Sequence, residues 1–119
     1  MPLPNDLVAL SNGACMSPSD AQHAAYTLAT RAADDPRLSI AAIYLLDTAH
    51  ALRTRGALHI ERLARADIEL AVGALRARRD AFRFDALTSS PDAGAADGAS
   101  ADALQRVLVV LLAALGVEP

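Results

Sequence analysis

Residues 102–116, DALQRVLVVLLAALG, decide the architecture, because they contain an unbroken apolar run over residues 107–115. A membrane-spanning helix needs about 20 apolar residues to cross roughly 30 Å of hydrocarbon. This run, at about 1.5 Å per residue, covers less than half of that thickness. Gln105 and Arg106 directly precede the run, so it does not extend further on the N-terminal side. A helix that lies on a membrane surface needs a basic polar face, and this helix has one arginine. We therefore predict a helix over residues 101–115 that packs against protein.

This helix is apolar on two sides. A stripe of leucines at helical spacing occupies one face: Leu104, Leu108, Leu111 and Leu115. The far face carries Val109, Val110 and Ala113. A helix that is apolar all round is normally covered all round. Either the helix is the central member of a bundle, or its far face meets another chain, and we favour the second.

The first helix of the chain is signalled by its capping residues. Ser17 can accept a hydrogen bond from the first turn, Pro18 suits the first helical position, and Asp20 favours the positive end of the helix dipole. We expect this helix over residues 18–33. Its stripe is mostly alanine, which lets a neighbouring backbone approach closely.

The second helix has the same kind of start, with Asp35 as the capping residue and Pro36 at the first helical position. We expect it over residues 36–54. Besides its core face it carries Ile40 and Tyr44 on the opposite side, so it raises the same question as the last helix.

The third helix is expected over residues 58–81, with apolar residues on one face and paired charges on the other. Residues 82–87 alternate apolar and polar side chains, so they fit a helix or an extended segment. Residues 88–99 are small, polar and glycine-containing, which predicts a mobile loop.

These patterns predict an all-α protein, a compact bundle of about four helices in a single domain over residues 17–116. Residues 1–16 are expected to be flexible or partly ordered. They lack the basic start and long apolar run of a signal peptide. The lone cysteine, Cys15, excludes a disulfide within the chain, so we expect a cytoplasmic protein.

The composition argues against several function classes. The net charge is −3, so no overall field favours nucleic acid. Aromatic residues make up only 3% of the chain, which is little for stacking bases or sugars. Lysine is absent and arginine supplies all 11 basic side chains, which indicates a GC-rich, bacterial genome.

Catalytic and metal-binding motifs are not evident in the sequence. Asp47 and His50 share a helix face at the spacing of helical metal sites, but a metal requires more ligands than these. No nucleophile elbow, phosphate loop, CxxC or HExxH is present. We therefore predict a protein that is not an enzyme, without a catalytic residue, metal or cofactor.

The remaining candidates are interaction surfaces. We expect a small adaptor, chaperone-like protein or assembly subunit that binds a protein partner or a second copy through helix–helix contacts. The predicted partner-binding residues are Ile40, Tyr44, Val109, Val110 and Ala113.

Two alternatives stay open. The first is a nucleic-acid-binding protein that uses Arg76, Arg78, Arg79 and Arg83, although acidic residues interleave with them. The second is a bundle that binds a small ligand between its helices, anchored by Tyr26 or Tyr44.

Overall fold

The computed structural model describes residues 7–8, 16–57 and 62–116. In these ranges the chain forms four α-helices that pack together, which confirms the predicted all-α bundle. They are α1 (Pro18–Arg31), α2 (Ser39–Arg55), α3 (Arg65–Thr88) and α4 (Pro91–Ala114). A short 3₁₀ helix, η2 (Pro36–Leu38), precedes α2. Two short strands, β1 (Leu7–Val8) and β2 (Leu63–Ala64), pair antiparallel with Leu7 opposite Ala64.

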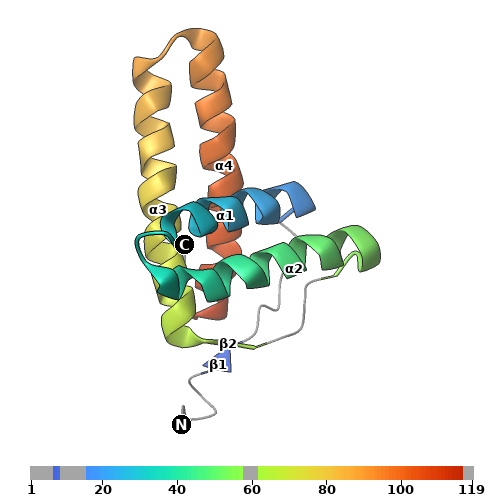
Figure 1. The fold of residues 1–119 in the computed structure, drawn as a ribbon. Helices are drawn as coiled ribbons and strands as arrows, with labels where there is room; N and C mark the ends of the chain where they lie inside the picture. The colour runs from blue at the N-terminus through green and yellow to red at the C-terminus, as the bar shows by residue number, and fades with distance from the viewer. Residues whose placement is uncertain (1–6, 9–15, 58–61, 117–119) are drawn as a thin grey trace.

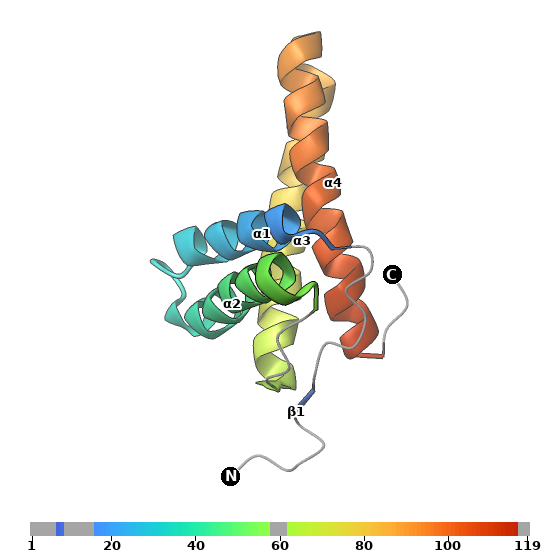
Figure 2. The same cartoon turned by 90° about the vertical axis from the view of Figure 1, so that its right-hand side faces the viewer.

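The helices form two pairs. Helices α3 and α4 lie side by side as a long antiparallel hairpin, and α1 packs along α2 (Figure 1). The α1–α2 pair lies crosswise against the lower half of the hairpin, whereas the upper half extends beyond it (Figure 2). No helix within the described ranges combines the length and apolar content needed to cross a membrane.

Local capping explains where α1 and α2 begin and end. The Ser17 side chain accepts a hydrogen bond from the Asp20 backbone, and the Asp20 side chain accepts one from the Ser17 backbone. Asp35 caps η2, whose Pro36 occupies the first helical position. Gly56 ends α2 with a positive φ of 65°, a conformation that glycine adopts without a steric penalty. The helices predicted over residues 18–33 and 36–54 are therefore confirmed to within two residues, with a 3₁₀ first turn in the second.

The core fills the space between the α1–α2 pair and the lower half of the hairpin. Helix α1 contributes mainly alanines (Ala21, Ala24 and Ala25), all with no exposed surface, so its backbone approaches its neighbours closely. The largest fully buried apolar side chains come from all four helices: Leu28, Leu45, Ile68, Leu75, Leu104, Val107, Leu108 and Val110. Burying a side chain of this size stabilises the fold by about 1.5–3 kcal/mol.

The predicted loop over residues 88–99 is wrong. Helix α3 continues to Thr88, and α4 begins at Pro91, so only Ser89 and Ser90 separate the two helices. Alanines are strong helix formers and proline suits a first helical position, which offsets a cost of about 1 kcal/mol for each glycine. Packing along α3 provides the remaining support. Residues 82–87, whose sequence fits a helix or an extended segment, are helical as part of α3.

The third helix starts later than expected. The prediction was residue 58, but Leu63–Ala64 is a strand and α3 begins at Arg65. Leu63 is buried, and the strand pairs with residues more than fifty positions earlier, a contact that local periodicity does not reveal. Residues 58–61 lie outside the described residues, as do Cys15 and most of the N-terminal segment predicted over residues 1–16.

Candidate functional site

An apolar patch lies on the outer face of α2. Ile40, Ile43 and Leu46 are 51%, 59% and 40% exposed, and their spacing of three residues places them along one side of the helix. We call these three residues the α2 patch. Ile40 and Ile43 also border a small hollow of about 160 Å³, together with Tyr44, Asp47 and Leu63.

The five residues predicted to bind a partner do not form one surface. Ile40 is exposed as expected and Ala113 is exposed on α4, while Val109 is half-buried. Tyr44 and Val110 are buried, with 3% and 2% of their surface exposed, so neither lies on the surface of this fold where a partner would contact it. Helices α2 and α4 make no extensive contact with each other, so their faces remain separate.

The burial of Val110 answers the question posed by the apolar run. Helix α4 packs against α3 along its length and also against α1, so its leucine stripe is largely covered. Its far face is covered at Val110, half-covered at Val109 and open at Ala113. Helix α2 is different, because α1 covers one side and the α2 patch stays exposed. Ile43 and Leu46 were not among the predicted partner-binding residues, although their spacing from Ile40 is visible in the sequence.

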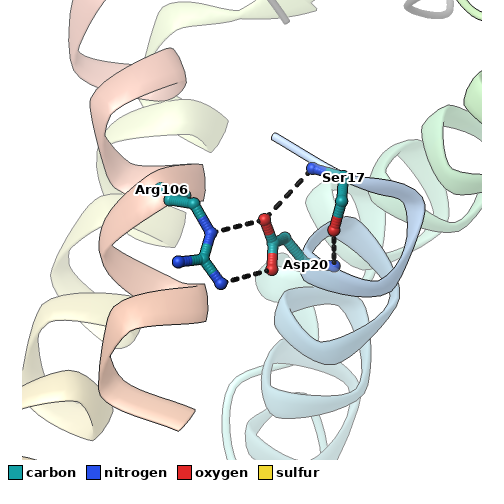
Figure 3. A network of polar contacts seen from close by, with 3 residues as sticks. All are labelled: Ser17, Asp20 and Arg106. Carbon is teal, nitrogen blue, oxygen red and sulfur yellow. Dashed lines mark hydrogen bonds and ion pairs between the residues drawn. The ribbon is translucent and has the colours of Figure 1, made fainter. Parts of the chain in front are cut away.

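A polar network ties α1 to α4 (Figure 3). The Arg106 side chain donates two hydrogen bonds to the Asp20 carboxylate, from Nε to Oδ2 at 2.7 Å and from Nη2 to Oδ1 at 3.0 Å. The Ser17 backbone N–H also donates to Asp20 Oδ2, at 3.1 Å. Such a two-pronged arginine–carboxylate contact fixes orientation as well as adding energy.

The environment of Asp20 keeps it ionised. Burial alone would raise the pKa of this carboxyl, but the hydrogen bond from Arg106, the hydrogen bonds from Ser17 and the positive charge of Arg106 lower the pKa below its ordinary value. Asp20 is therefore a charged anchor of the fold at neutral pH, with no proton to give to a substrate. Arg106 directly precedes the apolar run, and its hydrogen bonds connect α4 to Asp20, which lies 86 positions earlier in the sequence.

The four arginines predicted as an alternative nucleic-acid-binding surface do not contact the same neighbours. Arg79 donates to Gln105 of α4 at 2.6 Å and pairs with Asp80 at 2.9 Å. Arg78 instead lies over the ring of Phe82, 4.2 Å from its centre. Arg76 and Arg83 are exposed. A binding surface for phosphates needs its basic side chains to point together, and Arg78 and Arg79 do not.

Arg78 belongs to a second feature, a cleft between α1 and α3. Its lining comes from both helices: His23, Tyr26, Thr27, Thr30, Arg31, Arg78 and Phe82. We call this the α1–α3 cleft. Burial and the positive charge of Arg78 lower the pKa of His23, whereas Asp20 acts in the opposite direction. His23 is therefore a neutral imidazole at neutral pH.

The Asp47–His50 pair considered as a metal site lies on the exposed side of α2. It borders a hollow with Thr54 and Arg55. In the part of the chain that the structure describes, no three His, Cys, Asp or Glu side chains gather closely enough to hold a metal ion.

Comparisons with protein-family models, with curated protein sequences and with solved structures gave no match for this chain. Its function is therefore inferred from its own residues, chiefly the exposed aliphatic side chains of the α2 patch and the charged and ring-bearing lining of the α1–α3 cleft.

Proposed function

We propose that this protein acts through protein–protein association, and that the α2 patch packs against the α2 patch of a second copy. The observation that carries the proposal is the exposure of three large aliphatic side chains in a row on one helix. Single exposed apolar residues are normal on a protein surface, but a contiguous group marks a site of association.

The shape of the patch fits an antiparallel pairing of two helices. In a twofold contact each copy offers the same surface, so the patch must be complementary to itself. With Ile43 at the axis, Ile40 of one copy faces Leu46 of the other. All large side chains of the patch then meet apolar neighbours across the twofold axis.

Charge on either side of the patch supports the same pairing. Asp47 follows the patch and has no ion-pair partner among the residues that the structure describes. Arg37 precedes the patch; its side chain is 70% exposed and forms an ion pair with Asp35 of its own chain, from Nε to Oδ1 at 2.9 Å. The antiparallel overlap brings Arg37 of one copy within one helical turn of Asp47 of the other, where Asp47 can share the guanidinium with Asp35 and favour this register.

The size of the patch sets the expected strength. A stable interface buries about 800 Å² on each partner, or some 20–30 residues. Three side chains and their immediate neighbours provide less than this. We therefore expect a weak, concentration-dependent dimer.

Light scattering or sedimentation over a concentration series tests the proposal. The wild-type chain should shift from monomer to dimer as its concentration rises. Ile43→Asp should weaken the dimer by about 100-fold or more, because each dimer would bury two carboxylates at its axis. Circular dichroism should show an unchanged helical fold, since Ile43 is exposed in the monomer.

The matched control is Leu87→Asp. Leu87 is also a large aliphatic side chain, and 85% of its surface is exposed, but it lies at the far end of the hairpin. This variant should associate like the wild type. A wild-type chain that stays monomeric at millimolar concentration, or a Leu87→Asp variant that loses the dimer, would refute the α2 patch as the contact.

A further inference from the structure

The α1–α3 cleft has the size of a small-molecule site. It is a half-open hollow of about 410 Å³ between α1 and the middle of α3. Sites for small molecules are typically hollows of about 300–1,000 Å³ with mostly apolar walls and a few placed polar groups. The cleft is separate from the α2 patch, which shares none of its lining residues.

The charge in the cleft is of one sign. Arg31 and Arg78 both line it, one from each helix, and no lining residue is acidic. Among the described residues neither guanidinium forms an ion pair, so both are available to an anion. Arginine presents a planar fork of donors that suits the oxygens of a carboxylate or phosphate.

Ring-bearing side chains gather in the same place. The chain has two tyrosines, two phenylalanines and three histidines, and one of each kind lines this cleft. The rings of His23 and Phe82 are 6.0 Å apart, and Arg78 lies over Phe82. Tyr26 is exposed at the rim, so its ring and the outer face of the Arg78 guanidinium are both open to a flat ligand.

A polar atom in the wall lacks a partner. His23 Nε2 is buried, and no described residue forms a hydrogen bond with it. A buried polar atom without a hydrogen bond costs free energy, and here that cost falls on a residue that lines the cleft. The hydroxyls of Thr27 and Thr30 differ, because both already donate to backbone carbonyls of α1.

We propose that the α1–α3 cleft binds a small aromatic anion. The anionic group lies between Arg31 and Arg78, and the ring lies against Tyr26 and the Arg78–Phe82 pair. The two arginines, one from each helix, select the charge, and the clustered rings select the flat apolar part. This inference does not depend on the proposed dimer.

Titration calorimetry with three probes tests the site. Phenyl phosphate carries both the charge and the ring, inorganic phosphate carries only the charge, and phenol carries only the ring. Phenyl phosphate should bind at least tenfold more tightly than either of the other two. Nuclear magnetic resonance should show the largest shifts at the His23 and Phe82 rings.

Substitution on α3 provides a matched pair. Arg78→Gln should weaken phenyl phosphate binding about tenfold or more, because it removes a charge that lines the cleft. Arg76→Gln removes the same charge two residues away, outside the cleft, and should change the affinity less than twofold.

Three results would overturn the proposal. One is the absence of phenyl phosphate binding at millimolar concentration. Another is an affinity for inorganic phosphate or for phenol that equals the affinity for phenyl phosphate, which would mean that charge and ring do not act together. The last is an equal loss from Arg76→Gln and Arg78→Gln, which would show attraction to the general charge of the helix.

Discussion

The α3–α4 hairpin has two halves that differ in what surrounds them. In the lower half α1 and α2 lie against the hairpin (Figure 2). Side chains there such as Leu75 and Leu104 are completely buried. In the upper half, residues 76–100, no residue is buried, and Phe84 and Leu87 are largely exposed. Both halves are continuous helix. The two halves therefore share their secondary structure and differ in burial, and we expect burial against the second pair of helices to supply most of the stability.

The largest difference between the halves should appear when leucines are shortened. Leu104→Ala in the lower half should reduce the free energy of unfolding by about 3 kcal/mol, through lost burial and the cavity left behind. Leu87→Ala in the upper half should change it by less than about 0.5 kcal/mol, since the side chain is already in water. Urea denaturation measures both. Equal losses would mean that the upper half is as tightly packed as the lower.

Ion pairs should show the same contrast on a smaller scale. Arg106→Ala leaves the buried Asp20 carboxylate without its partner, and we expect a loss of about 2 kcal/mol. The pair between Arg79 and Asp80 lies in the upper half, and the Asp80 side chain is 63% exposed. Asp80→Asn should therefore cost no more than about 0.5 kcal/mol. Thermal unfolding at neutral pH compares the two variants.

Acid should act on the Asp20 pair in a defined direction. The pKa of Asp20 is lower in the folded chain than its ordinary value of about 4. The pair therefore contributes fully above pH 4, and its contribution is lost as the pH falls through the lowered folded value. Wild type and Arg106→Ala should differ most in stability at neutral pH and converge in acid. A constant difference down to pH 2 would contradict this assignment.

The smallest effects concern glycines of the upper half. A Cβ on Gly94 would lie 2.8 Å from the backbone oxygen of Ala86, so Gly94→Ala should push the helices apart and lower the melting temperature. A Cβ on Gly98 would meet nothing within 4 Å. Gly98→Ala should thus stabilise α4 by about 0.5–1 kcal/mol. Scanning calorimetry should show shifts of opposite sign, and two positive shifts would mean that the helices do not approach closely at Gly94.

The close approach at Gly94 also explains why residues 88–99 do not form the loop that their composition predicts. Small residues bury little surface, which is typical of a loop. Packed against Ala86, the same small residues allow two helices to lie close together. Composition does not distinguish a segment that is small because it is mobile from one that is small because a neighbour is near.

The candidate sites were predictable only in part. Ile40 was identified from its helical position, but Tyr44 and Val110 were assigned to the surface although the fold buries them. The α1–α3 cleft was not predicted as a site, because Arg31 and Arg78 belong to helices far apart in the sequence. Tyr26 had been noted as an anchor for a ligand between helices, and it does line the cleft.

The sequence by itself determined the helical class, the starts of α1 and η2, the end of α2 and the inability of residues 107–115 to cross a membrane. Caps and periodicity act within one or two turns, so they are readable without knowledge of the neighbours. Only the tertiary structure decided which apolar faces are covered, which arginines are paired and where a cleft opens. Those properties depend on which helices meet, and the energy of burial belongs to the pair of surfaces in contact.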